Sequence, residues 1–226
     1  MTTLILSTRN AHKVGEIRAI LSGDFRFFTL NDFPAAPKVI EDADSFAGNA
    51  AKKSVELAKW LSTISDSNLD CENIFVLADD SGLEVDALNG APGVYSARFA
   101  GGSGDDNSPD VANNEKLLRL LEDVLPEKRT ARFHCVIALT PLVFSMSKSQ
   151  SPACFADEAE LLTEIFAGAC EGRIAFVAGG QGGFGYDPLF IPNGFDKSFA
   201  ELGEVEKNKI SHRAKALEKL RARFAR

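Results

Sequence analysis

Residues 74–82 read Ile-Phe-Val-Leu-Ala-Asp-Asp-Ser-Gly, and this stretch decides the fold class. Its first five residues form an unbroken apolar run, which is typical of a strand that is buried on both faces. The polar residues that follow indicate that the strand ends at residue 78. Helical patterns alternate with strand patterns only in part along the chain, so the sequence predicts an α/β fold with a mixed sheet.

The chain before this strand is predicted to hold two further strands and two helices. Short apolar runs indicate strands at residues 3–7 and 25–30. A loop at residues 8–13 is expected to lead into a helix, because apolar residues recur there at helical spacing. Ser45 is a suitable N-cap for a second, longer helix.

The chain after this strand is predicted to begin with a hairpin. Asn89-Gly90 favours a tight turn between strands at residues 83–88 and 94–99. The Ser-rich stretch at residues 141–157 has little periodicity, so we expect an exposed excursion there. The other expected elements are a helix at 113–125, strands at 131–140 and 160–169, one more strand after Gly172 followed by a glycine-rich turn, and a final helix from about Ser211.

Length and composition indicate one globular domain, which we expect to span residues 1–226. No run approaches the roughly 18 apolar residues that a membrane span needs, and no signal peptide is evident. We therefore expect a cytoplasmic protein that does not enter a membrane. The net charge of −7 disfavours a nucleic-acid partner. The cysteines are too widely spaced to indicate a zinc site: Cys71, Cys135, Cys154 and Cys170.

Adjacent carboxylates, Asp79 and Asp80, stand at the predicted end of the buried strand. Carboxylate oxygens are ligands that Mg²⁺ prefers. Neighbouring side chains of a strand point to opposite faces, so we expect one of the two to face a ligand and the other to be structural. Glu41 adds a carboxylate ahead of the long helix, where it suits either a metal or the helix dipole. A turn without any ligand is the alternative for residues 79–82.

Two glycine-rich or polar segments suit a nucleotide. Residues 7–13 lie where a strand passes into a helix, a junction that suits a phosphate, and Lys13 adds a positive charge there. The glycines of residues 179–188 allow a ligand to approach the backbone closely. Within that segment, Phe184 and Tyr186 suit either stacking on a planar ring or packing in the core.

The start of the last helix carries cations. Ser211 is a candidate N-cap, which places His212 and Arg213 in the first turn. A cation at this position opposes the helix dipole, so a bound anion explains it better than helix stability does.

Together these segments resemble the inosine triphosphatase family, the dITP/XTP pyrophosphatases. The shared motifs occur in the family's order across nearly the whole chain, which makes the resemblance specific. The motifs are Ser7-Thr-Arg-Asn-x-x-Lys13, Glu41 with Ser45-Phe46, Asn49-Ala50 with Lys53, Ala78-Asp-Asp-Ser-Gly-Leu83, Gly90-Ala-Pro-Gly-Val-Tyr-Ser-Ala-Arg98, Phe133-His-Cys135, Gly183-Phe-Gly-Tyr-Asp-Pro188 and Ser211-His-Arg213.

The resemblance implies a long, twisted mixed sheet flanked by helices, two lobes with the substrate in a central cleft, and a homodimer. It implies an enzyme that hydrolyses deaminated purine nucleoside triphosphates (dITP/ITP and dXTP/XTP) to the monophosphate and pyrophosphate, and so cleanses the nucleotide pool. Mg²⁺ is the implied cofactor, with Glu41 and Asp80 as its ligands and Asp80 as general base for water attack at the α-phosphorus. The implied substrate-binding residues are Thr8, Arg9, Asn10, Ala11, His12, Lys13, Ser81, Phe184, Gly185, Tyr186, Asp187, Lys207, His212 and Arg213.

The chain also departs from the family pattern. Arg9 and His12 stand where small residues are common, Gly48 stands where many members carry Glu, and the stretch at 141–157 is longer than usual. Two alternatives stay open. A pyrophosphatase for modified pyrimidine nucleotides would share the phosphate and metal residues but lack the terminal Ser-His-Arg pattern. A noncatalytic protein that binds nucleotides or a partner would tolerate the loss of Asp80, Glu41 or Lys13, and all three are present.

Overall fold

The structure, a computed structural model, describes residues 1–23, 25–64, 69, 73–101, 107–143 and 158–225. In this part of the chain no helix is both long enough and apolar enough to cross a membrane. The elements are β1 (Thr2–Leu6), α1 (Ala11–Ile20), β2 (Phe25–Thr29), α2 (Phe46–Leu61), β3 (Ile74–Val85), the 3₁₀ helices η2 (Asp86–Leu88) and η3 (Gly93–Arg98), α3 (Asp110–Leu120), the 3₁₀ helix η4 (Pro126–Lys128), β4 (Thr130–Pro141), α4 (Glu158–Leu161), β5 (Glu164–Ile174), β6 (Phe190–Pro192), α5 (Phe199–Ile210) and α6 (His212–Phe224).

The strands form one six-stranded sheet in the order β2-β1-β3-β4-β5-β6. β1 pairs in parallel with β2 and with β3, so that Ile5 lies opposite Phe28 on one side and Val76 on the other. β5 and β6 pair antiparallel, with Arg173 opposite Ile191. The predicted α/β fold with a mixed sheet is confirmed.

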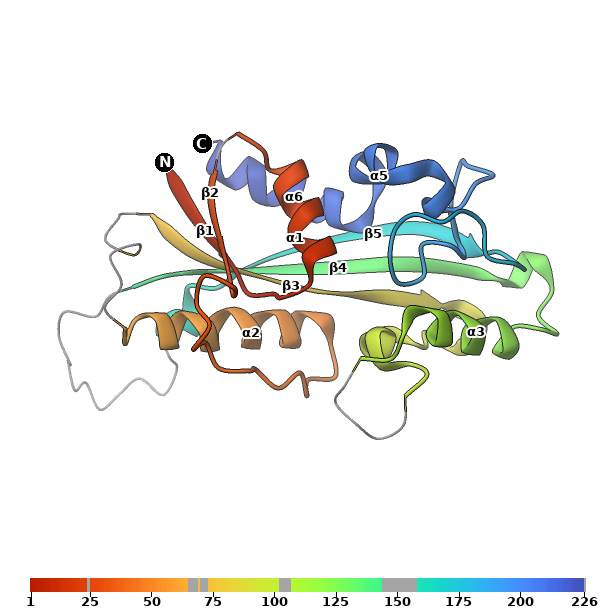
Figure 1. Cartoon of the computed structure of the whole chain (residues 1–226), viewed down its shortest axis with the longest axis horizontal. Coiled ribbons are helices and arrows are strands. Elements are labelled where there is room, and N and C mark those ends of the chain that lie inside the picture. The colour runs from red at the N-terminus through yellow and green to blue at the C-terminus, as the bar shows by residue number, and fades with distance from the viewer. Residues whose placement is uncertain (24, 65–68, 70–72, 102–106, 144–157, 226) are drawn as a thin grey trace. The chain divides into compact units, whose positions relative to one another are not determined.

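The chain divides into two compact units, of which the first comprises Met1–Asp80 and Val136–Phe166. Figure 1 shows α1 on one side of the strands of this unit and α2 on the other. Apolar side chains of α2 pack on β1 and β3 in a buried cluster that includes Ile5, Leu57 and Ile74.

The second unit comprises Ser81–Cys135 and Ala167–Arg226. Figure 1 shows α3 on one side of its strands, and α5 and α6 on the other. Its core contains a group of aromatic rings, in which the centroid of Phe133 lies 4.7 Å from that of Phe190 and 6.1 Å from that of Phe199. Aromatic pairs at such separations stabilise a core beyond the area they bury.

β3 is longer than the sequence predicted. The strand continues from Ile74 through both aspartates to Val85, so Asp79 and Asp80 lie within it and not at its end. Ionised aspartates are unfavourable in the interior of a strand. Here each carboxylate forms an ion pair with a lysine, which offsets that cost.

The predicted hairpin is wrong in both strands: the first ends at Val85, with residues 86–88 in the 3₁₀ helix η2, and the second does not form. Asn89 and Gly90 do adopt positive φ, at 53° and 87°, as a tight turn requires. The chain then forms the 3₁₀ helix η3 in place of a strand at residues 94–99, and a single bridge from Glu84 to Pro92 is the remaining pairing. The Ser96 hydroxyl stabilises η3 and holds it against β3, because it donates to the Gly93 carbonyl at 2.6 Å and accepts from the Leu83 N–H at 2.9 Å.

Other boundaries also differ. α3 ends at Leu120 and Pro126 opens η4, whereas the sequence predicted a helix to residue 125. β5 runs to Ile174 and so takes in Gly172, and the separate strand expected between Gly172 and the glycine-rich turn does not form. The short strand β6, which follows that turn, was not predicted. α5 was not predicted. Some of the predicted features lie outside the described residues: residues 102–106 of the loop at 101–110, the stretch at 144–157, Cys71 and Cys154.

Candidate active site

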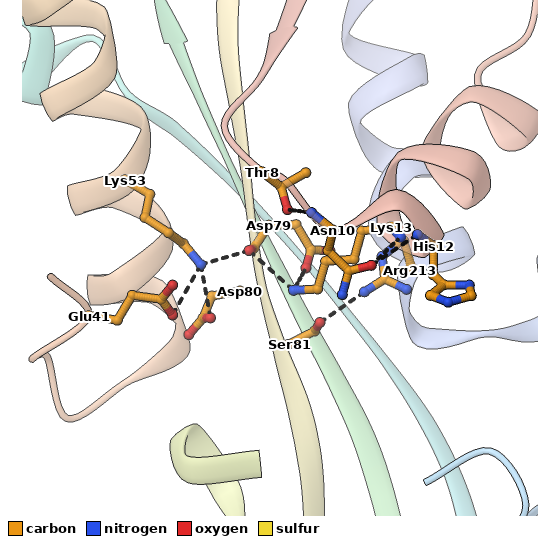
Figure 2. A network of polar contacts seen from close by, with 10 residues as sticks. All are labelled: Thr8, Asn10, His12, Lys13, Glu41, Lys53, Asp79, Asp80, Ser81 and Arg213. Atoms are coloured by element: carbon orange, nitrogen blue, oxygen red, sulfur yellow. Dashed lines mark hydrogen bonds and ion pairs between the residues drawn. The ribbon is translucent and has the colours of Figure 1, made fainter. Parts of the chain in front are cut away.

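Two lysines hold three carboxylates in the first unit (Figure 2). Lys53 of α2 lies between Glu41 and Asp80, with its Nζ 3.3 Å from Glu41 Oε2 and 3.1 Å from Asp80 Oδ1. The same ammonium donates to the Asp79 carbonyl at 2.9 Å. Lys13 of α1 forms an ion pair with the Asp79 carboxylate. We call these five residues the carboxylate cluster.

Burial and charge together set the proton affinities in this cluster. Burial raises the pKa of Asp80 above its ordinary value, although Lys53 and Lys13 act against it. Burial also raises the pKa of Glu41, but the attraction of Lys53 and Lys13 lowers it by more, so this pKa lies below its ordinary value. Burial would lower the pKa of Lys53, yet the carboxylates raise it, so this ammonium stays charged. Asp80 is therefore the carboxylate whose basicity its surroundings increase, as a proton acceptor requires.

The start of α1 is built around Asn10. Its side chain is the N-cap, accepting hydrogen bonds from the N–H groups of His12 at 2.9 Å and Lys13 at 3.1 Å. Thr8 Oγ1 in turn accepts from the Asn10 N–H at 3.1 Å. His12 and Lys13 thus belong to the first helical turn, and the prediction of a loop through residue 13 is wrong. Four predicted substrate-binding side chains at this helix start are exposed: Arg9, Asn10, Ala11 and His12.

In the second unit, a buried ion pair fixes the glycine-rich loop. Lys207 of α5 and Asp187 are almost completely buried, and Lys207 Nζ lies 2.5 Å from Asp187 Oδ2. The same carboxylate oxygen accepts from the Phe184 N–H at 3.0 Å. Lys207 Nζ lies 4.4 Å from the centroid of the Phe184 ring, which is a cation–π distance. In this loop the ring of Phe184 is therefore in contact with the Lys207 ammonium.

The first turn of α6 places two more predicted residues in the second unit. Ser211 is the N-cap and accepts from the Ala214 N–H at 3.1 Å, as the sequence predicted. His212 is buried, and its ring stacks on Phe133 with centroids 4.7 Å apart and an interplanar angle of 12°. Arg213 is fully buried and donates to Ser81 Oγ at 2.9 Å, which Figure 2 also shows. Within its unit, the structure thus joins two predicted residues that are 132 positions apart.

Tyr186, in contrast, is a core residue. It is 3% exposed, and its hydroxyl donates to the Ser96 carbonyl at 2.9 Å. Burial raises the pKa of this phenol strongly, so it stays protonated. Of the two aromatic residues for which stacking and core packing were both open, Tyr186 packs in the core, and Phe184 is half-buried.

Two residues of α3 that the sequence reasoning missed hold Gly185. The Asp110 carboxylate accepts from the Gly185 N–H at 2.7 Å, and the Asn114 amide donates to the Gly185 carbonyl at 2.9 Å. Their spacing of four residues puts both on one face of α3. A polar pair at this spacing was the feature of the sequence that could have identified them.

The sequence reasoning also gave no role to Lys53. Its position in the helical pattern could have indicated one, because Lys53 lies on the same helical face as Ala50 and Leu57, which are buried. A lysine on the buried face of a helix needs an anion, because a buried, unpaired charge is strongly unfavourable.

Gly48, where many family members carry Glu, has little room for a side chain. A Cβ atom added there would lie 2.8 Å from the Cβ of Ala43 and 3.2 Å from Ser45 Oγ. The local backbone is therefore fitted to glycine at this position, and Glu41 and Asp80 remain as carboxylates around Lys53.

Comparisons with known proteins bear on both units. A profile described as the Ham1 family matches residues 4–223. The dITP/XTP pyrophosphatase of Desulforamulus reducens is 45% identical over 217 residues, which are 96% of this chain and 92% of that protein.

Solved structures give the same result. A HAM1 protein from Coxiella burnetii superposes with a TM-score of 0.75 at 35% identity, covering 100% of this chain and 99% of that chain. The Ham1 protein of Staphylococcus aureus superposes with a TM-score of 0.74 at 34% identity, covering 99% and 98%.

Proposed function

This chain belongs to the Ham1 family, and from that membership we propose that it is a nucleoside triphosphate pyrophosphatase acting on deaminated purine nucleotides, dITP/ITP and dXTP/XTP. Water attacks the α-phosphorus, and the products are the nucleoside monophosphate and pyrophosphate. The observation that carries the proposal is the carboxylate cluster, in which a buried carboxylate of increased basicity lies beside the helix start that suits a triphosphate.

Each residue of the cluster has a task in this reaction. Asp80 orients the attacking water and accepts its proton, because its raised pKa favours the protonated form more than an ordinary aspartate does. Lys13 offsets the charge of the leaving pyrophosphate, since an ammonium has three donors and its contacts with the carboxylate and the carbonyl of Asp79 leave the third for a phosphate oxygen. Lys53 keeps Glu41 and Asp80 together until substrate arrives.

The donor set fits Mg²⁺. Glu41 and Asp80 offer carboxylate oxygens, and no group of three or more His, Cys, Asp or Glu side chains among the described residues could enclose a metal ion. Mg²⁺ commonly takes one or two carboxylates and completes its shell with water and substrate phosphates, so two ligands suffice. When bound, Mg²⁺ supplies charge neutralisation on the phosphate oxygens.

Selection among purines is assigned to the second unit. Hypoxanthine and xanthine carry a 6-keto acceptor, whereas adenine has a 6-amino donor. Lys207 and Arg213 can only donate, so adenine would leave donors facing donors. A buried mismatch costs about 1–3 kcal/mol, so we expect about 5- to 160-fold discrimination against ATP. Guanine shares the keto group, and its rejection needs a further feature near the 2-amino position.

The test is pyrophosphate release from ITP, XTP, GTP and ATP, with Mg²⁺ and with a chelator. Fast release from ITP and XTP that stops with the chelator is expected. Equal turnover of all four nucleotides would contradict the selectivity, and no turnover at all would favour a binding protein. Asp80→Asn should keep nucleotide binding and lose turnover; full turnover in this variant would remove Asp80 from both its assigned roles.

The assembly and the location are further parts of the proposal. We propose a homodimer, which light scattering would report as about twice the 24.4 kDa mass of the chain. A cytoplasmic location and a single domain over residues 1–226 stay predictions from the sequence.

A further inference from the structure

The first turn of α6 lies directly against β5, and Gly168 makes this possible. A Cβ atom at Gly168 would collide with the carbonyl oxygen of His212 and lie 2.6 Å from the backbone nitrogen of Ala216. It would also lie 3.0 Å from the Cβ of Lys215, whereas ordinary contacts begin at 3.4 Å. Two of these neighbours are backbone atoms, so no flexible side chain can give way. Glycine is needed here for close approach.

Two lysines of α6 fix the helix along the same strand. Lys215 Nζ donates to the Ala169 carbonyl at 2.8 Å, and Lys219 Nζ donates to the Ala167 carbonyl at 2.6 Å. These carbonyls flank Gly168 on either side. The glycine therefore sets how closely α6 approaches β5, and the lysines set its position along the strand.

This turn carries two of the predicted substrate-binding residues, and one of them, Arg213, is assigned to purine selection. His212 and Arg213 follow directly after the N-cap Ser211, and both are nearly or completely buried. His212 stacks on Phe133, and Arg213 donates to Ser81 at 2.9 Å. Because both side chains are held by short contacts, a shift of the turn by about 1 Å would misplace both, and displacements of that size are enough to weaken recognition by tenfold or more.

We propose that Gly168 is a positioning residue for purine selection, acting through the contact of its backbone with the first turn of α6. It touches no nucleotide itself. The inference rests on the proposed function, in which Arg213 contributes to purine selection; His212 is a substrate-binding residue that the family resemblance implies. It concerns a part of β5 that carries no other assigned role, and it adds a residue that the sequence motifs do not contain.

The experiment is Gly168→Ala, with steady-state kinetics for ITP and ATP. The methyl group should displace the turn, raise KM for ITP at least about tenfold with a smaller change in kcat, and reduce the preference for ITP over ATP by a similar factor. Leu220→Ala is the matched control. Leu220 is fully buried in the same helix two turns further on, so this truncation should lower stability and leave the preference unchanged.

The possible results distinguish a failure of the proposed function from a failure of the role proposed for Gly168. If the wild-type enzyme shows no preference for ITP over ATP, the proposed function fails and this inference with it. If the wild type has the preference and folded Gly168→Ala retains it with an unchanged KM, Gly168 has only a structural role and the inference alone is overturned. If Gly168→Ala does not fold, Lys215→Met removes one fixing contact without a clash; it should raise KM for ITP about threefold, and an unchanged KM would overturn the inference.

Discussion

Lys53→Met should destabilise the protein because it removes the cation from between two carboxylates. Methionine keeps most of the volume and leaves Asp80, which is 7% exposed, without its closest positive charge. Breaking a buried ion pair in this way costs about 3–5 kcal/mol. The side chain of Glu41 is 38% exposed and can turn toward water, so its share is small. We therefore expect the free energy of unfolding to fall by about 3 kcal/mol, the lower end of that range, which corresponds to a melting temperature lower by about 6–12 °C.

The assay is urea unfolding in the presence of a chelator, with Lys52→Met as control. Lys52 is the neighbouring residue in α2 and also pairs with a carboxylate, Asp42 at 2.6 Å, but on the surface. Exposed pairs contribute little, so the control should unfold almost as the wild type does. Equal stability losses in the two variants would refute the electrostatic argument.

The pH dependence gives a second check on Lys53→Met. Lys53 lowers the pKa of Asp80, so its removal raises that pKa further above the value in the unfolded chain. A group whose pKa is raised by folding favours the folded state at low pH and loses that contribution as the pH rises through the folded pKa. The stability deficit should therefore shrink as the pH is lowered from neutrality through the folded-state pKa of Asp80. A deficit that does not vary with pH would point to lost packing.

Three further predictions address the second unit. Tyr186→Phe leaves the buried Ser96 carbonyl without its donor, and urea unfolding should show a loss of about 1–3 kcal/mol; no loss would contradict the hydrogen bond. Asp187→Asn removes the negative charge 2.5 Å from buried Lys207 and should lower the free energy of unfolding by about 3 kcal/mol, whereas a neutral result would mean that the pair adds nothing. Burial raises the pKa of the Cys170 thiol to about 11, so iodoacetamide followed by peptide mass spectrometry should find Cys170 alkylated only after denaturation; rapid labelling of the native protein would contradict its burial.

The sequence was sufficient wherever the determining interaction was local. The N-caps at Ser45 and Ser211 were predicted, because each caps its helix by bonding an N–H three residues on. α5 carried a similar signal in the capping box of Ser198 and Glu201, but Gly203, with φ of 78°, interrupts its helical pattern. Because of that interruption the helix was not predicted, although the family resemblance implied a binding role for its residue Lys207.

The errors occurred where a distant residue decides the local conformation. Asp79 and Asp80 have the composition of a turn, yet they lie within β3 because lysines 66 and 27 residues away neutralise them. The pairing of Arg213 with Ser81 is equally invisible to spacing rules, since each residue by itself fits a helix start or a turn. Such contacts depend on the tertiary fold, so local propensity could not have supplied them.

The extension of β3 through both aspartates explains how adjacent identical residues acquire different tasks. Successive side chains of a strand point to opposite faces, so Asp79 meets Lys13 of α1 and Asp80 meets Lys53 of α2. In Figure 1 these helices lie on opposite sides of the strands of the first unit. The ion pair of Lys13 with Asp79 thereby joins the helix start proposed to bind the triphosphate to the strand that carries Asp80, the proposed proton acceptor. A turn at Asp79 would have separated the two, so the strand geometry is part of the catalytic arrangement that we propose.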